Sequence, residues 1–310
     1  MLDRRQIIKL GAGLSAGSSL LLTAGNTAAA VPIQSAPLRR SIPSSGELLP
    51  VIGMGTSLTF DTNDNPDTLA QLTEVMRIFI AGNGRAIDSS PMYGNAESRV
   101  GGVLAAIDKQ PKLFVATKVW TTGRDQGIAQ MQESARRMGV DRFDLIAVHN
   151  LLDWRVQLAT LKEWKDQGKV RYIGITTSHG RHHQELLAIM RSEPLDFVQF
   201  SYNIEDRVAE RELLPLAQDR GIATMINRPY QRGSLFAKSK GQPLPGVATE
   251  LGCDSWAQFY LKFIVGHPAT TCVIPATAKV SHMTDNMKAN YGGIPDTQQR
   301  AEMLRSFQAL

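Results

Sequence analysis

Four side chains that can take part in acid–base chemistry stand at or just beyond the ends of short apolar runs. Asp88, Lys118 and His149 each end such a run, and Tyr93 lies five residues after Asp88 in a loop. A phenol has an ordinary pKa of about 10, which is too high for easy proton donation at neutral pH. A neighbouring ammonium lowers that pKa, a carboxylate holds the ammonium in place, and an imidazole can orient a carbonyl oxygen. The four residues therefore indicate a proton donor for carbonyl reduction, for which a cofactor must supply the hydride.

Alternating strands and helices are needed to bring these side chains together. Short runs rich in β-branched and aromatic residues predict buried strands, at 51–54, 86–87, 113–116, 145–148, 170–175, 197–200, 223–226 and 272–274. Stretches with apolar residues every three or four positions predict helices, at 67–82, 96–107, 125–138, 155–167, 182–192, 206–219, 254–265 and 279–290. This alternation predicts a single (β/α)8 TIM barrel over residues 31–310, with its chemistry at the carboxyl ends of the strands.

Two details of the first part of the barrel bear on this prediction. Residues 38–42 and 47–50 flank a turn and predict a β-hairpin before the barrel. An open doubly wound sheet is the competing layout, but its phosphate loop needs a third glycine that "GMGTSL" lacks. The barrel is therefore favoured.

The same residues resemble the aldo-keto reductase family, from about residue 38 to residue 290. The resemblance is carried by "AIDSSPMYGNAE" with Asp88 and Tyr93, by Lys118 in "VATKVW", by His149 in "LIAVHN" and by "IGMGT". It implies that hydride passes from NADPH, or alternatively NADH, to the carbonyl of a small aldehyde or ketone. Tyr93 would then donate the proton and Lys118 would lower its pKa. Asp88 would support Lys118, and His149 would position the substrate.

The resemblance also implies a set of residues that contact the cofactor. These are Gly55, Thr56, Thr176, Thr177, Gln199, Asn227, Arg228, Thr277, Lys279, His282, Asp285 and Asn286. Asn227 departs from the family pattern, because many members place a nicotinamide-stacking aromatic ring there. Ala276 and His282 replace the Lys and Arg that grip the 2′-phosphate in well-known members. Lys279 and Arg228 can compensate as point charges.

Several further residues invite chemical interpretations. Trp120 and Phe60 are expected to line an apolar substrate pocket, with rim packing as the alternative. The histidines of the 179–185 segment could face a metal, but no acid or cysteine cluster completes a site, so a helix start is favoured and no metal is expected. Cys272 lies in an apolar run and is expected to be a buried thiol; pairing with Cys253 is left open.

The first thirty residues differ from the rest of the chain. Arg4-Arg5 precedes a weakly hydrophobic segment rich in glycine, and Ala28-Ala29-Ala30 offers a small-residue cleavage site. This pattern predicts a cleavable export signal over residues 1–30, resembling the twin-arginine type, with a general secretory signal as the alternative. Cleavage near Ala30 would leave a periplasmic protein without membrane insertion. The twin-arginine export machinery would be its partner, because that route carries folded proteins with cofactor already loaded.

Charge and composition set limits on other functions. The net charge is +5, but basic and acidic residues are interspersed and form no polybasic run. Nucleic-acid binding is therefore not expected. A second class of function remains open, in which a sensor or partner subunit binds the nicotinamide nucleotide and turns over little.

Overall fold

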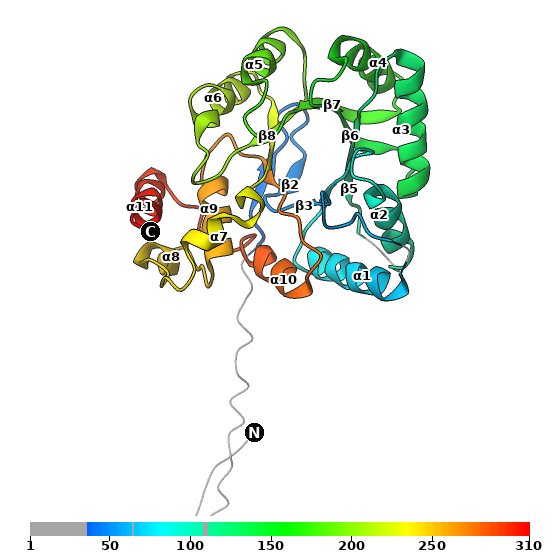
Figure 1. Cartoon of the computed structure of the whole chain (residues 1–310). Helices are drawn as coiled ribbons and strands as arrows, with labels where there is room; N and C mark the ends of the chain where they lie inside the picture. Colours follow the sequence, from blue (N-terminus) through cyan, green and yellow to red (C-terminus); the bar gives the residue numbers. More distant parts are fainter. Residues whose placement is uncertain (1–35, 64, 108–110) are drawn as a thin grey trace, which may run out of the picture. The chain divides into compact units, whose positions relative to one another are not determined.

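A closed barrel of parallel strands forms the centre of the chain. The computed structural model describes residues 36–63, 65–107 and 111–310, so the expected export signal lies outside the described residues. The strands follow one another in chain order around the barrel: β3 Met54–Gly55, β4 Ala86–Asp88, β5 Phe114–Val119, β6 Phe143–His149, β7 Val170–Thr176, β8 Phe197–Ser201, β9 Ala223–Asn227 and β10 Cys272–Val273. Parallel bridges from Ile52 to Val273 and from Gly55 to Ala276 close the ring. The predicted (β/α)8 fold is confirmed (Figure 1).

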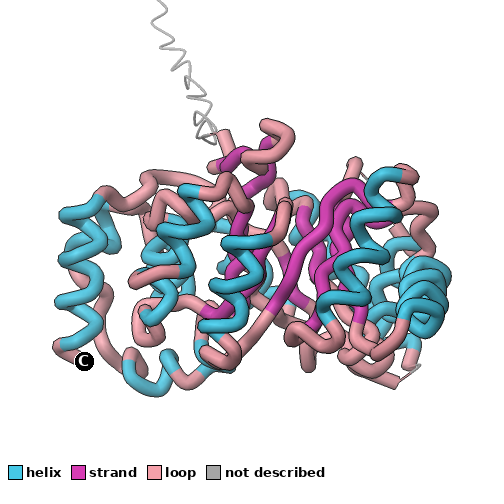
Figure 2. Tube along the Cα trace, turned by 90° about the horizontal axis from the view of Figure 1, so that it is seen from above, coloured by secondary structure: helices cyan, strands magenta, loops and turns pink. Residues whose placement is uncertain are grey.

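Helices surround the strands on the outside of the barrel, as the tube view shows (Figure 2). Their bounds are α1 Pro66–Ala81, α2 Ala96–Ala105, α3 Arg124–Met138, α4 Trp154–Asp166, α5 His183–Ser192, α6 Leu213–Asp219, α7 Leu235–Lys238, α8 Gly246–Glu250, α9 Trp256–Val265, α10 Val280–Lys288 and α11 Thr297–Gln308. The expected helix over 206–219 is split into a 3-10 turn at Val208–Glu210 and α6. Pro215 has no N–H to donate, so it is tolerated in the first turn of α6 but not inside one long helix. The prediction of a single helix there is wrong.

The alternation of side chains along each strand separates two cores. In β5, Phe114 and Ala116 belong to the cluster inside the barrel, whereas Val115 and Val119 belong to the larger cluster between strands and helices. Successive strand residues point to opposite faces, which accounts for this division. Lys118 shares the face of Phe114 and Ala116, so the periodicity directs it into the barrel.

The predicted hairpin is present and packs at the amino end of the barrel. β1 (Arg39–Ser41) and β2 (Leu48–Pro50) pair antiparallel. Ile42 and Leu49, from the hairpin segment, join the interior cluster that contains the stacked ring of Tyr172. The hairpin therefore closes the end of the barrel opposite to the expected chemistry.

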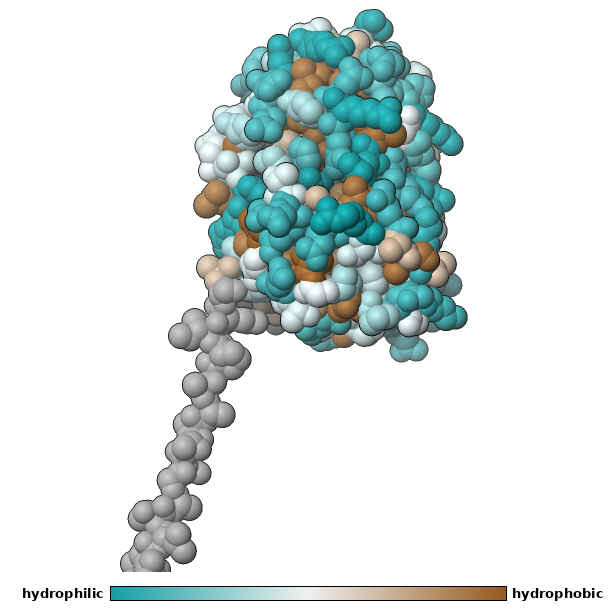
Figure 3. Space-filling view, turned by 90° about the vertical axis from the view of Figure 1, so that its left-hand side faces the viewer, coloured by the Kyte–Doolittle hydropathy of each residue, from teal (hydrophilic) through white to brown (hydrophobic). Residues whose placement is uncertain are grey.

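The outer surface is polar with scattered apolar residues. On the face seen in Figure 3, hydrophobic side chains lie as small separate areas among hydrophilic ones. None of the helices in the described ranges combines the length and the apolar character needed to cross a membrane.

Candidate active site

A buried ion pair lies at the carboxyl end of the barrel strands. Lys118 is 0% exposed, and its Nζ donates to Asp88 Oδ2 at 2.6 Å and to the carbonyl oxygen of Ser89 at 2.8 Å. Asp88 Oδ1 accepts from Gln199 Nε2 at 3.1 Å. Burial lowers the pKa of Lys118, but the charges and hydrogen bonds of Asp88 and Tyr93 outweigh burial and raise it overall. Lys118 is therefore an ammonium at neutral pH.

The phenol of Tyr93 lies beside this ammonium. The Nζ of Lys118 is 5.1 Å from the centroid of the Tyr93 ring. Burial raises the pKa of Tyr93, Lys118 opposes the rise through its charge and a hydrogen bond, and the charge of Asp88 adds to it. Lys118 therefore lowers the pKa of Tyr93, as expected, but burial outweighs this contribution and the net direction is upward. The free energy lost when the phenolate is removed from water is larger than the stabilisation that the Lys118 ammonium provides. Tyr93 therefore stays protonated until the proton is transferred in a reaction.

His149 completes the group as a neutral imidazole. Its Nδ1 is 2.9 Å from Ser90 Oγ, and its ring stands edge-on to the Tyr93 ring with centroids 5.7 Å apart. Burial, followed by the charge of Lys118, lowers the pKa of His149 to about 3. The backbone N–H of Met92 donates to Ser90 Oγ, which leaves the Ser90 hydroxyl hydrogen available to His149 Nδ1. We assign the proton of the imidazole to Nε2 on this basis.

A cavity of about 980 Å³ opens above these side chains. It brings together most of the residues that the sequence analysis singled out: Asp88, Tyr93, His149, Gly55, Thr56, Thr176, Gln199, Asn227, Arg228, Thr277, His282, Asp285 and Asn286. Lys118 lies buried beneath it. Thr177 is also buried, at 1% exposed, and Lys279 caps the start of α10; neither lines the cavity.

Neither aromatic residue that was expected in the substrate pocket lines the cavity. Phe60 is 0% exposed and belongs to the core between strands and helices. Trp120 is 40% exposed, and Gln130 of α3 hydrogen-bonds both its backbone N–H and its carbonyl. Both assignments are corrected. The exposed apolar side chains in the lining are instead Leu58, Met92 and Phe236.

The lining near β9 carries positive charge. Arg228 and Arg232 line the cavity, and neither has an ion-pair partner within the part of the chain that the structure describes. Arg228 donates to Nε2 of His179. Burial, followed by the like charge of Arg232, lowers the pKa of Arg228, so the two guanidiniums are close enough to repel each other. Unpaired guanidiniums in a cavity fit the anionic pyrophosphate or 2′-phosphate of a nicotinamide nucleotide.

The polar side chains beyond this cluster are held by internal hydrogen bonds. Asn227 receives a hydrogen bond from Ser201 and donates to the carbonyl of Thr177. The Tyr230 hydroxyl donates to Asn286 Oδ1 at 2.6 Å, and Ser255 donates to Asp285. At the end of β7, Thr176 lines the cavity and its hydroxyl donates to Gln199 Oε1 at 2.8 Å. The residues present therefore fit the expected cofactor.

Sequence reasoning missed several residues that the structure places at the site. Ser90, which contacts His149, could have been found as the second serine of "AIDSSPMYGNAE", directly beside the assigned residues. Arg232 and Tyr230 follow Arg228 closely in sequence, but nothing in the residue types there indicates which side chains turn inward. Trp256 comes from α9, far along the chain, and carries no local signal at all.

The other candidates for metal or redox chemistry do not form a site. Across the described ranges, no group of three or more His, Cys, Asp and Glu side chains is placed to hold a metal ion. His182 is the N-cap of α5, as the helix-start interpretation expected. Cys253 and Cys272 are both buried free thiols, which answers the open question of their pairing in this structure.

The comparisons with known proteins agree with this geometry. The sequence model of the Aldo/keto reductase family matches residues 51–303. The methylglyoxal reductase YeaE of Escherichia coli is 28% identical over 260 residues, which cover 80% of this chain and 88% of that protein. The NADH-specific methylglyoxal reductase of the same organism is 28% identical over 194 residues, 52% and 57% of the two chains. An aldo-keto reductase from Klebsiella pneumoniae in complex with NADPH superposes with a TM-score of 0.71 at 20% identity, covering 87% and 95% of the chains.

Proposed function

This chain belongs to the aldo/keto reductase family and is an NAD(P)H-dependent oxidoreductase of carbonyl groups, and on that premise we propose that its substrates are small 2-oxoaldehydes. The observation that carries the reductase assignment is the assembly of Tyr93, Lys118, Asp88 and His149 around one cavity. Two relatives named methylglyoxal reductases support the choice of substrate. With the site complete, a sensor with little turnover is not favoured.

The residues of the site divide the proton chemistry among them. A reduced nicotinamide held in the cavity would supply the hydride for the carbonyl carbon. Tyr93 donates its proton to the carbonyl oxygen as that oxygen gains negative charge, and Lys118 stabilises the phenolate that remains. His149 is neutral at neutral pH, because its pKa is lowered to about 3. It donates a hydrogen bond from Nε2 to the same oxygen and orients the substrate. Asp88 keeps the ammonium of Lys118 directed at Tyr93.

We propose NADPH as the preferred nucleotide, because Arg228 and Arg232 leave positive charge in the cavity lining. An Arg228→Ala variant should raise the KM for NADPH by about tenfold or more, since a charge-assisted contact to phosphate is lost. The matched control is Arg220→Ala, an exposed arginine at the end of α6, which should leave the KM unchanged. A KM for NADH below that for NADPH would contradict the nucleotide preference and leave the reductase activity in place.

The substrate assignment is tested with the purified protein. NADPH oxidation should accelerate when methylglyoxal is added, and one alcohol should form per NADPH consumed, measured by absorbance and by NMR of the product. A bulky aromatic ketone should react more slowly than methylglyoxal if small 2-oxoaldehydes are the substrates, even though Tyr230, Phe236 and Trp256 also line the cavity. NADPH oxidation that does not depend on any added carbonyl would contradict the proposal.

We further propose that residues 1–30 direct export to the periplasm by the twin-arginine route. Arg4-Arg5 and the small-residue site near Ala30 support this. Replacing Arg4-Arg5 with Lys-Lys should retain the protein inside the cell, measured by fractionation and immunoblotting. Unchanged export of that variant would rule out the twin-arginine route and favour the general secretory one.

A further inference from the structure

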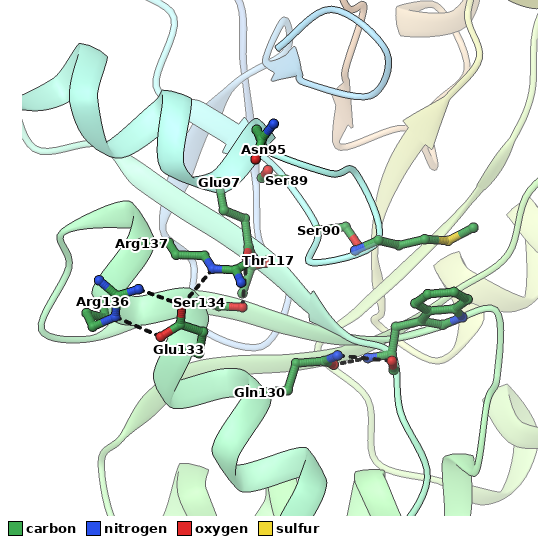
Figure 4. A network of polar contacts seen from close by, with 12 residues as sticks. Ser89, Ser90, Asn95, Glu97, Thr117, Gln130, Glu133, Ser134, Arg136 and Arg137 are labelled. Atoms are coloured by element: carbon green, nitrogen blue, oxygen red, sulfur yellow. Dashed lines mark hydrogen bonds and ion pairs between the residues drawn. The ribbon is translucent and has the colours of Figure 1, made fainter. Parts of the chain in front are cut away.

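One buried carboxylate takes no part in the chemistry described so far. Glu97, in the first turn of α2, is 0% exposed. It accepts hydrogen bonds from Thr117 Oγ1 at 2.6 Å and from Ser134 Oγ at 3.1 Å, with Arg137 Nη1 4.0 Å away. Figure 4 shows Glu97 pointing from α2 toward these side chains. Burying a carboxylate costs several kcal/mol unless it is well paired, so its place in the fold calls for an explanation.

The partner of Glu97 on β5 is the residue next to Lys118. Thr117 and Lys118 are adjacent, so they point to opposite faces of the barrel wall. On the inner face Lys118 donates to the carbonyl of Ser89 at 2.8 Å. On the outer face Thr117 donates to Glu97. Ser89 begins the loop that carries Tyr93, and Glu97 is the second residue of α2, the helix that follows this loop. Two adjacent residues of one strand therefore hold both ends of the loop, and we call these two contacts the loop clamp.

The backbone within the loop transmits the clamp to Tyr93. The N–H of Tyr93 donates to the carbonyl of Ser90 at 3.0 Å, and the N–H of Ala96 donates to the carbonyl of Tyr93 at 3.1 Å. These two turns leave few internal degrees of freedom between Ser89 and Glu97. A shift of the first turn of α2 would therefore move the Tyr93 phenol relative to Lys118 on β5.

We propose that Glu97 is a positioning residue, which acts through Thr117 to hold the Tyr93 hydroxyl in place against the Lys118 ammonium. This inference rests on the proposed function, because carbonyl reduction is its main readout. A misplacement of about 1 Å at a reacting group can lower the rate by two orders of magnitude. A small shift of the Tyr93 hydroxyl relative to Lys118 would therefore be measurable as a lower kcat.

The shape of the site supplies the variants for a test. Thr117→Val keeps the shape of the side chain and removes the contact of the loop clamp at Glu97, while the contact from Lys118 to Ser89 remains. Ser134→Ala removes the other hydroxyl on the same carboxylate, from α3, and leaves the loop clamp intact. Glu97→Gln keeps the shape of the side chain and one acceptor oxygen, which can still receive the hydrogen bond of Thr117, whereas Glu97→Ala removes both.

The expected outcomes differ between these variants. Thr117→Val and Glu97→Ala should lower kcat by about tenfold, with an unchanged KM for NADPH, because the cofactor lining is untouched. The kcat of Ser134→Ala should stay within about twofold of the wild-type value, even if this variant loses as much thermal stability as Thr117→Val. Glu97→Gln should recover most of the kcat lost in Glu97→Ala. Hydrogen exchange of the 89–96 segment should accelerate in Thr117→Val and not in Ser134→Ala.

Each contrary outcome is decisive. If kcat falls equally in Thr117→Val and Ser134→Ala, in proportion to their stability, then Glu97 is only a structural residue and the proposal is overturned. Should the wild type reduce no carbonyl, the proposed function fails, and hydrogen exchange alone decides the inference. Unchanged exchange of 89–96 in Thr117→Val would show that the contact between Thr117 and Glu97 does not restrain the loop, and would overturn the proposal.

Discussion

The two ends of the barrel are built from the same strands but carry opposite kinds of side chain. β5 begins with Phe114, in the aromatic cluster, and has Lys118 near its end, in the buried ion pair. β8 begins with Phe197 and continues to Gln199, which contacts Asp88. At the amino end the interior is apolar and the hairpin packs against it. At the carboxyl end it is charged and opens into the cavity.

This difference separates stability from chemistry along each strand. Aromatic rings with centroids 5.6 to 5.9 Å apart fill the amino end, where burial of apolar area stabilises the fold. At the carboxyl end the burial of Asp88 and Lys118 contributes little net stability, because desolvation offsets their attraction. The apolar packing at the amino end stabilises the strands, and this allows the fold to keep a buried ion pair at the carboxyl end that adds little stability of its own.

The largest expected effect is on kcat, and it should differ between the two ends when one tyrosine hydroxyl is removed from each. Tyr93→Phe should lower kcat by about 10²- to 10⁴-fold, because the proton donor is lost. Tyr172→Phe, whose hydroxyl contacts Ser45 and Glu47 in the hairpin segment, should leave kcat unchanged. Steady-state kinetics with NADPH and methylglyoxal measure both. Equal rates in the two variants would remove the assigned role of Tyr93.

A cavity at the amino end should have the reverse effect. Phe197→Ala removes a ring that is 1% exposed and contacts two other rings, and should lower the free energy of unfolding by about 3–5 kcal/mol. The kcat per folded molecule should stay near the wild-type value, because Phe197 lies at the start of β8 and not at the site. Chemical denaturation and active-site titration measure the two quantities. A large loss of kcat with little loss of stability would show that the two ends are not separable.

The features of the fold and the site that could be predicted from the sequence are those that a short stretch of residues indicates by itself. Continuous apolar runs marked the strands, because strands buried on both faces need them. The order of Asp88, Tyr93, Lys118 and His149 indicated the site, because strand ends meet at one end of a barrel. The hairpin was visible from its turn.

The remainder depends on contacts between distant segments. Trp120 was expected in the pocket, but Gln130 of α3 holds its backbone. The helices α7 and α8 have four and five residues, too few to show a helical period. The net direction of the Tyr93 pKa depends on how deeply the loop buries the ring, which no pattern of residue types reports. Pro215, by contrast, is a local feature of the sequence from which the break in the helix expected over 206–219 could have been predicted.

The carboxyl end should also respond to pH through His149, which is 6% exposed. Its pKa is lowered from 6.5 to about 3 in the folded protein, so the unfolded chain binds the proton more readily. Its contribution to stability is therefore full above pH 6.5 and is lost as the pH falls toward 3. The stability difference between the wild type and His149→Asn should shrink by up to about 1.4 kcal/mol per pH unit in that range. Denaturation at several pH values measures it, and a difference that is constant with pH would show that His149 is not buried neutral.

The smallest expected effect is at the ion pair of the amino end. Arg171 pairs with Glu47 of the hairpin segment, and the two side chains are 21% and 30% exposed. Glu47→Gln should lower the free energy of unfolding by about 1 kcal/mol or less, and by less still at high salt, because water screens partly exposed charges. Although burial opposes the shift, Arg171 and Tyr172 lower the pKa of Glu47 overall, so its contribution is present above pH 4.5 and fades below it. Asp88→Asn, at the buried pair, should cost about 3–5 kcal/mol, because Lys118 would be left buried and unpaired. Similar losses in the two variants would mean that burial does not distinguish the two ends of the barrel.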